Sequence, residues 1–429
     1  MKILFVNPSF SKSKDNEIDF PINNKIPWSV IIGPSLTFQM LTATTPEEHQ
    51  VKLIDEMYQK IDFNEEYDLV GISSTTPHAP RAYEIADEFR KRAVKVVLGG
   101  WHSSVLPGEA KRHADAVVIG EAEESWPQLL KDVENKTLKP FYEKPVNLET
   151  IPAAERKRLM HKGGCFIFQV QATRGCTTGC RYCCVTNSNY GCKIRFRPIE
   201  HVIEEIESIP QKLFYFSDPS LTLNPRYTKQ LFKAMRRLNK KFSCNGNMNI
   251  LYRDYELLKL AKEAGCTEWD IGFESVSQES LDLIGKRTNK VEEFASTIDK
   301  IHNFGMAVKG NFMFGMDGDY PDIFDKTIDA ICDWELDLVS FSILTPFPGT
   351  PLFESLEREK RILTSDWTKY DACHVVFQPK YMSPQELFDG YKRVNKTIGS
   401  TYNKTLRAIK CLKFGPYAFL TTGLANFFH

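Results

Sequence analysis

The chain has 429 residues, 42% of them hydrophobic and 26% charged, and its 55 Lys and Arg residues balance 55 Asp and Glu residues. These values are typical of a globular protein with roughly three domains of ~150 residues, and they exclude collagen-like, low-complexity and disordered chains. The formal net charge of zero argues against a general nucleic-acid binder, which usually carries a basic excess.

Apolar runs that predict strands alternate with helix-like stretches through residues 1–135. Strands that alternate with helices indicate βαβ units and a parallel sheet with helices on both faces. We therefore predict a doubly wound, Rossmann-like α/β domain over 1–135, with a ligand crevice at the carboxyl ends of its strands. No G-x-G-x-x-G follows the first strand, so a dinucleotide site is weakly supported. The expected strands lie at 2–6, 51–55, 69–73, 94–98 and 116–119.

A connector containing Pro140, Pro145 and Pro152 is expected over residues 136–165. Repeated strand–helix units follow over 166–350, and they predict a full or partial barrel. Residues 351–429 are expected to form a mostly helical C-terminal region. The strand-like runs of the second series lie at 166–171, 213–216, 268–272, 308–314 and 338–344.

The most specific motif is Cys176-Thr-Thr-Gly-Cys180-Arg-Tyr-Cys183. The chain has 11 cysteines, an odd number, and its first residues lack a secretion signal. In a long chain of this kind, thiols more often bind metals or take part in redox chemistry than form a disulfide scaffold. Three thiolates from one short loop can hold three irons of a cubane iron–sulfur cluster and leave the fourth iron open. The alternative is a zinc site completed by Cys184 or Cys192, although zinc spacings more often use a second, distant cysteine pair.

The C-x3-C-x2-C motif, with Tyr182 before its last cysteine, resembles the signature of radical S-adenosylmethionine (radical SAM) enzymes. The resemblance implies a partial (β/α)6-type barrel over 166–350. It also implies a [4Fe-4S] cluster on Cys176, Cys180 and Cys183, whose open iron binds the amino and carboxylate groups of S-adenosylmethionine (SAM). Reductive cleavage of SAM then yields a 5′-deoxyadenosyl radical. This chemistry implies an external electron donor such as flavodoxin or ferredoxin.

The same resemblance implies that SAM is bound by Tyr182, Asp218, Glu274 and Asn311. Relatives often carry Gly-Gly-Glu or Asp-Asp-Asn where this chain has Ser217-Asp218-Pro219, so only Asp218 keeps an obvious acceptor for the SAM ammonium. Taken alone, each of these residues could equally be an ordinary carboxylate or amide of a surface loop. Their positions at successive expected strand ends favour chemistry at the top of the barrel.

With the cysteine motif downstream, the N-terminal segments 73–82, 98–102 and 120–123 resemble those of cobalamin-dependent (class B) radical SAM enzymes, and the resemblance extends to about residue 400. Many cobalamin proteins supply an axial histidine from D-x-H-x-x-G, which this sequence lacks, so we expect no histidine on cobalt. His78 could lie near cobalt or could be an ordinary surface loop histidine, and the sequence favours neither. The resemblance implies cobalamin binding by Ser74, Thr75, Thr76, His78, Gly99, Gly100, Gly120 and Glu121.

This family resemblance implies a methyltransferase that acts on an unactivated carbon of an unknown substrate, which is a small molecule, a lipid or a peptide. One SAM would methylate cobalamin, and a second would generate the radical that removes hydrogen from the substrate. One alternative is a cyclase or carbon–carbon coupling enzyme without net methylation. Another is a non-enzymatic regulator that binds cobalamin or an iron–sulfur cluster. A methylthiotransferase is disfavoured because no cysteine precedes Cys165.

The last residues, 401–429, carry Lys404, Arg407, Lys410 and Lys413 but no Asp or Glu, and they end in an aromatic-apolar stretch. Such a tail fits peripheral contact with a membrane surface or a helix docked on the barrel, and docking is favoured. No apolar run reaches the ~18 residues of a membrane span, and the first residues lack a signal-peptide pattern. We therefore expect a cytoplasmic protein with no nucleic-acid partner.

Overall fold

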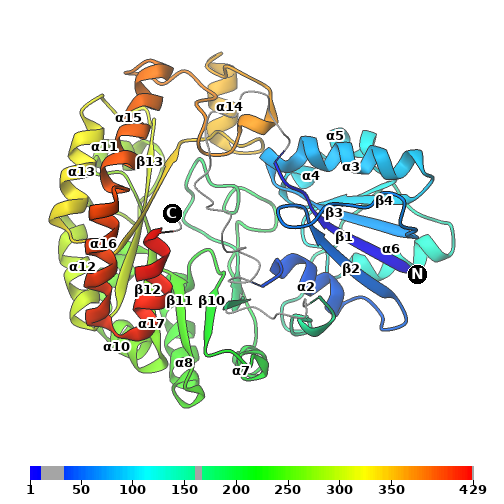
Figure 1. The fold of residues 1–429 in the computed structure, drawn as a ribbon, viewed down its shortest axis with the longest axis horizontal. Coiled ribbons are helices and arrows are strands. Elements are labelled where there is room, and N and C mark those ends of the chain that lie inside the picture. Colours follow the sequence, from blue (N-terminus) through cyan, green and yellow to red (C-terminus); the bar gives the residue numbers. More distant parts are fainter. Residues whose placement is uncertain (11–32, 160–166, 428–429) are drawn as a thin grey trace. The chain divides into compact units, whose positions relative to one another are not determined.

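The computed structural model describes residues 1–10, 33–159 and 167–427, which form two compact units (Figure 1). Unit 1 contains residues 1–10 and 33–159 together with a short segment from much later in the chain, Ser365–Asp371. Unit 2 contains residues 167–364 and 372–427. The chain therefore returns to unit 1 briefly before it completes unit 2.

Unit 1 is built on a six-stranded sheet with the strand order β2-β1-β3-β4-β5-β6, and every neighbouring pair is parallel. The strand order reverses at β1, between β2 and β3, which is the topological switch point where ligands bind in such sheets. The predicted parallel α/β sheet is confirmed, and β6 adds a strand inside the expected connector. The strands are β1 (Lys2–Asn7), β2 (Gln50–Asp55), β3 (Leu69–Ser73), β4 (Lys95–Gly99), β5 (Ala116–Val118) and β6 (Phe141–Tyr142).

Helices cover both faces of the unit 1 sheet. Leu4 and Val6 of β1 lie in a buried cluster with side chains of α3 (Ala79–Lys91) and α5 (Pro107–His113). Their neighbours Ile3 and Phe5 lie in a second cluster with α2 (Leu36–Ala43) and α6 (Trp126–Glu134). Successive side chains of a strand point to opposite faces, and the four central residues of β1, 3–6, are all apolar because both faces are covered.

Unit 2 contains a second six-stranded parallel sheet, in the order β14-β13-β12-β11-β10-β7, so that spatial order follows chain order. Strands β7 and β14 form its two edges, which gives the predicted partial barrel. Strand β11 was not among the predicted strands. The strands are β7 (Ile167–Val170), β10 (Leu213–Phe216), β11 (Lys241–Asn245), β12 (Cys266–Glu274), β13 (Ala307–Phe314) and β14 (Leu338–Ile343).

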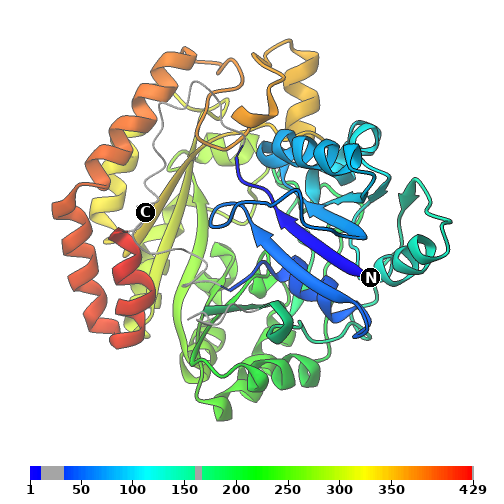
Figure 2. The same ribbon diagram turned by 45° about the vertical axis from the view of Figure 1, so that its right-hand side comes forward.

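The helices of unit 2 lie along the outer side of this sheet (Figure 2). Aromatic contacts mark that side: Phe232 of α8 packs on Phe242 of β11 at 5.5 Å, and Phe294 of α12 packs on Phe273 of β12 at 4.9 Å between ring centroids. The helices that follow the strands are α7 (Ile199–Ser208), α8 (Pro225–Met235), α10 (Tyr255–Ala264), α11 (Gln278–Leu283), α12 (Phe294–Asn303) and α13 (Ile323–Asp333).

The inner side of the unit 2 sheet is polar. The residues that alternate with the buried aromatics point the other way, because side chains of a strand alternate between faces. A polar inner surface at the centre of a partial barrel suits a charged or strongly hydrogen-bonding ligand. These inward positions are Tyr215, Ser243, Asn245, Asp270, Gly272, Glu274, Lys309, Asn311, Ser340 and Ser342.

The C-terminal region is helical and includes α14 (Pro351–Arg358), α15 (Pro384–Ile398) and α16 (Thr401–Lys410). The tail after α16 is docked on unit 2. The Thr422 hydroxyl bonds to the Glu268 carboxylate, and Asn426 Nδ2 donates to the Asp337 carbonyl at 2.9 Å. In the described residues, none of the helices combines the length and the apolar composition that crossing a bilayer requires.

Candidate active site

The three-cysteine motif forms a loop after β7, and two short strands close its base. Strand β8 (Thr173–Arg174) pairs antiparallel with β9 (Arg195–Phe196). Between them, Gly175 has a φ of +93°, and a Cβ there would lie 2.0 Å from the Lys193 carbonyl oxygen. Only glycine fits such a position without displacing backbone. The neighbouring Cys176 N–H donates to the Gly191 carbonyl at 2.8 Å.

Hydrogen bonds within the loop hold the cysteines together. Asn187 Nδ2 donates to the carbonyl oxygens of Cys180 at 2.8 Å and Cys183 at 2.7 Å. Burial is the main reason why the pKa of the Cys180 thiol is raised to about 11, since the lowering effect of Lys286 is opposed by the nearby Cys183, Glu274 and Cys176 charges. Burial likewise raises the pKa of Cys183. Thiolates there need a strong positive charge beside them, which coordinated iron would supply.

A single metal ion and a cubane cluster place different demands on the positions of their ligands. In the part of the chain that the structure describes, no three His, Cys, Asp or Glu side chains are grouped so that they could hold one metal ion. A tetrahedral zinc ion needs its ligands to converge on one point. In a cubane each thiolate binds a different iron, so Cys176, Cys180 and Cys183 need no common centre. Their role as cluster ligands stays a prediction.

Tyr182, Glu274 and Lys286 form a hydrogen-bonded group beside the cysteines. The Tyr182 hydroxyl and Lys286 Nζ both donate to Glu274 Oε1, each at 2.8 Å. Burial by itself lowers the pKa of Lys286, but the charges of Glu274, Cys180 and Cys183 raise it overall. The group therefore places a buried ammonium ion next to two of the three predicted cluster ligands. No motif in the sequence points to Lys286.

The backbone at the end of β12 directs the Glu274 side chain. Glu274 has a φ of +65°, in the left-handed region that non-glycine residues rarely adopt. The pairing of β12 with β13 shifts register between Gly272 and Glu274. A Cβ at Gly272 would lie 2.4 Å from Glu274 Oε1, so glycine leaves room for the carboxylate. Bulges and strained residues of this kind commonly orient functional side chains.

Asp218 lies just after β10 and is completely buried. Both of its carboxylate oxygens accept the Ala172 N–H at 3.2 Å, and Oδ1 also accepts the Thr173 N–H and, at 2.6 Å, the Thr173 hydroxyl. Burial raises the pKa of Asp218 to about 6, against the effect of these bonds. Asp218 thus holds the turn that leads into the cysteine loop. Its predicted contact with the SAM ammonium stays a prediction, and these bonds indicate a second role.

Asn311 belongs to a polar group on the inner face of the sheet. Its Nδ2 donates to Asp270 Oδ1, and Lys309 Nζ donates to Asp270 Oδ2 at 2.8 Å. The predictions named Asn311 but neither Asp270 nor Lys309. The signal was present in the sequence, because Lys309 and Asn311 are two residues apart and therefore share a face of one strand. SAM binding by Asn311 stays a prediction.

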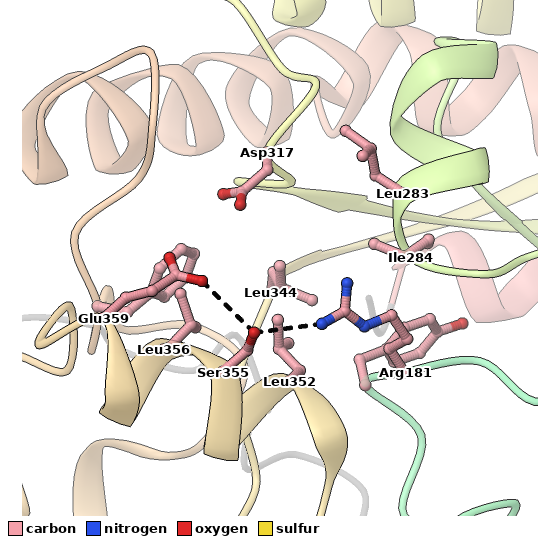
Figure 3. Close-up of a pocket in the computed structure, with 11 residues that line it drawn as sticks. Arg181, Leu283, Ile284, Asp317, Leu344, Leu352, Ser355, Leu356 and Glu359 are labelled. Atoms are coloured by element: carbon pink, nitrogen blue, oxygen red, sulfur yellow. Dashed lines mark hydrogen bonds between the residues drawn. The ribbon is translucent and has the colours of Figure 1, made fainter.

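Arg181 lies between two of the cysteines and points into a neighbouring pocket (Figure 3). Its guanidinium donates to Ser355 Oγ at 3.3 Å, and its backbone N–H donates to the Ile284 carbonyl at 2.9 Å. The Leu352 N–H donates to the Arg181 carbonyl at 3.1 Å. The cysteine loop is therefore tied to the ends of α11 and α14. The pocket is mainly apolar, with Leu283, Ile284, Leu344, Leu352, Leu356 and Phe377 in its lining.

In unit 1, buried polar atoms without a protein partner gather in the segments that follow β3 and β4, the second of which includes the short helix α4 (Trp101–Val105). Such atoms are rare in folded proteins, because leaving them unpaired costs free energy. Their grouping at the carboxyl edge of the sheet fits a ligand rich in amide and phosphate groups, such as cobalamin. Among the described residues the atoms in these segments are Ser74 Oγ, Thr76 Oγ1, Trp101 Nε1, His102 Nδ1 and Ser103 Oγ.

The loops predicted to bind cobalamin lie side by side. The Ser74 N–H donates to the Gly99 carbonyl at 3.2 Å, and the Gly120 N–H donates to Ser104 Oγ at 2.8 Å, with Glu121 next in the chain. Gly100 has a φ of +91°, and a Cβ there would lie 2.6 Å from the Ser74 carbonyl oxygen. The structure thus brings the three predicted segments to one edge of the sheet. Their contact with cobalamin stays a prediction.

His78 ends a short 3-10 helix, Thr76–His78, that follows β3. Its Nδ1 lies 2.8 Å from Thr75 Oγ1, and its ring centroid lies 4.3 Å from that of Phe10. Burial lowers the pKa of His78, which favours the neutral ring. Two neighbours therefore hold the ring in place, and one of its nitrogens is engaged by Thr75.

The returning segment Ser365–Asp371 covers His102, at the same edge of the unit 1 sheet. The Trp367 ring lies 5.4 Å from the His102 ring, and its Nε1 lies 3.5 Å from Glu109 Oε2. Glu109 Oε1 in turn lies 3.1 Å from His102 Nε2 and accepts the Tyr83 hydroxyl at 3.0 Å. No feature of the sequence pointed to this contact, which joins residues far apart in the chain.

Comparisons with known proteins agree with both halves of this description. Residues 170–331 match the family model of the radical SAM superfamily, and residues 34–130 match that of the B12 binding domain. The bacteriochlorophyllide d C-12(1)-methyltransferase of Chlorobaculum tepidum is 32% identical over 360 residues, which cover 80% of this chain and 77% of the relative. The anaerobic magnesium-protoporphyrin IX monomethyl ester cyclase of Cereibacter sphaeroides is 26% identical over 361 residues, 74% of this chain and 58% of the relative.

The fold is also similar to that of a solved structure. The radical SAM methyltransferase TsrM from Kitasatospora setae, solved with cobalamin and a [4Fe-4S] cluster bound, superposes with a TM-score of 0.67 at 18% sequence identity. The match covers 91% of this chain and 85% of that one. At this identity the similarity establishes the architecture, a parallel α/β unit followed by a partial barrel.

Proposed function

This chain belongs to the cobalamin-dependent radical SAM methyltransferases, and on that premise we propose that it methylates an unactivated carbon of a small-molecule substrate. The observation that carries the proposal is the 32% identity to a C-methyltransferase over 80% of the chain. It is supported by the cysteine loop of unit 2 and the unpartnered polar atoms of unit 1. The proposed division of the chain is 1–135, 136–165, 166–350 and 351–429.

We propose that Cys176, Cys180 and Cys183 hold the cluster and that Glu274 accepts a hydrogen bond from SAM. When bound, the cofactors supply the 5′-deoxyadenosyl radical and the methyl group, and an electron donor such as flavodoxin or ferredoxin supplies electrons. The chain itself holds the ligand residues in position and balances their charge. Asn187 holds two of the cysteine carbonyls, and Lys286 offsets the negative charge of Glu274 and the thiolates.

In unit 1 we propose that the carboxyl edge of β3, β4 and β5 holds cobalamin. Ser74 and Thr76 would use their unpartnered hydroxyls to bind its amide or phosphate groups. Gly100 lets two loops pack backbone against backbone and so keeps this edge compact. His102 Nε2 lies 3.1 Å from Glu109 Oε1, while His102 Nδ1 is buried at the same edge without a protein partner.

The test uses the full chain, reconstituted anaerobically with iron and sulfide and loaded with hydroxocobalamin. It is incubated with SAM, a chemical reductant and a panel of tetrapyrrole and lipid substrates that includes bacteriochlorophyllide d. Mass spectrometry then follows the substrate, S-adenosylhomocysteine and 5′-deoxyadenosine. We expect a product heavier by one CH2 group, formed together with both nucleoside products.

The relationship to a cyclase gives a second candidate, a radical reaction without net methylation. In that case 5′-deoxyadenosine and a modified substrate would form with no gain of a CH2 group. A regulator that only binds the cofactors would form no 5′-deoxyadenosine at all. Either result would contradict the proposed methyl transfer.

A further inference from the structure

Large apolar side chains are exposed along one face of α16 and of the chain just after it. Tyr402, Leu406 and Ile409 follow helical spacing and are 72%, 40% and 57% exposed. Leu412 and Leu420 continue this surface with 55% and 50% exposure. We call these five residues the C-terminal patch. Among the other exposed large apolar side chains of the described residues, Tyr320 and Tyr381 stack on each other at 4.5 Å between ring centroids, and Phe427 lies further along the same tail.

The rest of the tail holds the patch outward. Arg407 Nε donates to Asn426 Oδ1 at 2.7 Å, Lys410 pairs with Glu335, and the Thr422 hydroxyl bonds to buried Glu268. Ala408 is buried. Because one side of α16 and the tail is anchored on unit 2, the exposed apolar side chains cannot turn inward without breaking these bonds. The patch is therefore a stable feature of the surface.

The charged residues that the patch segment itself contributes are all basic, and Glu335 of the preceding part of unit 2 pairs with one of them, Lys410. Residues 400–427 contain Lys404, Arg407, Lys410 and Lys413 and no Asp or Glu. Lys410 and Lys413 are exposed, and the Lys413 ammonium lies 4.8 Å from the Phe414 ring. An apolar helix face flanked by basic side chains is the pattern of helices that lie in the plane of a membrane surface. Lysines at such a surface are attracted to anionic lipid headgroups.

We propose that the C-terminal patch docks on the surface of a bilayer that contains anionic lipid, with α16 parallel to the membrane plane. The apolar side chains enter the boundary between headgroups and acyl chains, while Lys413 meets lipid phosphates and Lys410 stays paired with Glu335. A second copy of the chain is a poorer partner, because a symmetric contact through this patch would bring the same basic residues together. This inference is independent of the proposed methyl transfer.

The experiment is flotation of the full-length chain with vesicles of phosphatidylcholine alone or mixed with phosphatidylglycerol. We expect the wild-type chain to float with the mixed vesicles and to dissociate as salt rises, because salt screens the lysine–phosphate attraction. The double variant Leu406→Gln, Ile409→Gln should bind at least roughly tenfold more weakly, since two exposed apolar side chains no longer leave water. Leu363→Gln is the matched control, because Leu363 is 52% exposed outside the patch.

Both substituted side chains are exposed, so we expect the double variant to fold like the wild type. Circular dichroism melting checks this. Failure of the wild-type chain to bind the mixed vesicles would overturn the proposal. Equal binding by the double variant would do the same. Self-association in sedimentation velocity, lost in the double variant and unaccompanied by vesicle binding, would show that the patch joins two copies of the chain instead.

Discussion

Lys286 Nζ lies 2.8 Å from Glu274 Oε1, and the two side chains are only 14% and 13% exposed. This ion pair connects the end of β12, where SAM binding is proposed, with the surroundings of Cys180 and Cys183. A buried ammonium ion is stable there because it faces the Glu274 carboxylate, and thiolates at Cys180 and Cys183 would stabilise it further. Lys286 therefore contributes to the electrostatic environment of any cluster that the loop holds.

Replacement of Lys286 by Met should lower the reduction potential of the reconstituted cluster. The substitution removes a positive charge beside two predicted ligands, so an added electron is less well stabilised. Redox titration followed by electron paramagnetic resonance measures the potential directly. Lys290→Met is the matched control, since Lys290 is exposed and lies four residues away on the same loop. An unchanged potential in Lys286→Met would contradict the proposed influence on the cluster.

The ligand assignment predicts different outcomes for neighbouring cysteines. The wild-type chain should bind about four irons and four sulfides, and Ala at Cys176, Cys180 or Cys183 should abolish SAM cleavage because the cubane loses a ligand. Cys184→Ala and Cys192→Ala should retain the iron. Iron and sulfide analysis together with 5′-deoxyadenosine formation checks both statements. Loss of iron in Cys184→Ala as complete as in Cys176→Ala would make the assignment wrong.

The variant Asp218→Asn distinguishes a structural role of Asp218, in holding the turn before the cysteine loop, from direct binding of the SAM ammonium. An amide presents only one oxygen and adds an N–H group, so it cannot accept all the bonds from Ala172 and Thr173 that the carboxylate accepts. We expect a loss of roughly 1–3 kcal/mol for the unpaired buried groups and a lower iron content, because the turn before the cysteine loop loosens. Thermal melting and iron analysis test this. Full iron content with weakened SAM binding would instead favour the role as an acceptor for the SAM ammonium.

Hydrophobic patterns predicted both parallel sheets. In unit 1 the central strands are apolar because helices cover both faces, whereas the strands of unit 2 alternate buried apolar residues with inward polar ones. Strand β11 was missed because Ser243 and Asn245 interrupt its apolar residues with inward polar ones. The C-x3-C-x2-C motif was visible because its ligands are close in sequence. Lys286 was not, because its importance depends on the fold bringing it to Glu274.

Contacts between segments that are distant in the chain could not be predicted from the sequence either. The Ser365–Asp371 segment belongs to unit 1 although both of its flanks belong to unit 2. No local pattern around Trp367 indicates that its ring lies against His102. The unpartnered polar atoms of Trp101 and Ser103 became candidates only because the structure shows that they are buried.

Glu268 predicts a pH dependence of stability. Burial raises its pKa from 4.5 to about 7. A carboxyl whose pKa is raised on folding stabilises the protein fully below its unfolded pKa, and this contribution is lost as pH rises through the folded pKa. The melting temperature should therefore fall between about pH 5 and about pH 8, with a loss of at most ~3 kcal/mol. Glu268→Gln cannot ionise and should show a smaller fall, and an equal fall in both proteins would refute this origin.

The last prediction concerns the corrinoid. The full chain, incubated with hydroxocobalamin and desalted, should retain about one corrinoid per chain, since unit 1 offers unpartnered buried groups at the carboxyl edge of its sheet. Cob(II)alamin in the protein should give an electron paramagnetic resonance spectrum without nitrogen splitting from an axial base. The sequence lacks D-x-H-x-x-G, and His78 is held by Thr75 and Phe10. His78→Ala should leave the spectrum unchanged. A nitrogen-split spectrum that disappears in His78→Ala would make His78 an axial ligand, and a chain that retains no corrinoid would remove cobalamin from unit 1 altogether.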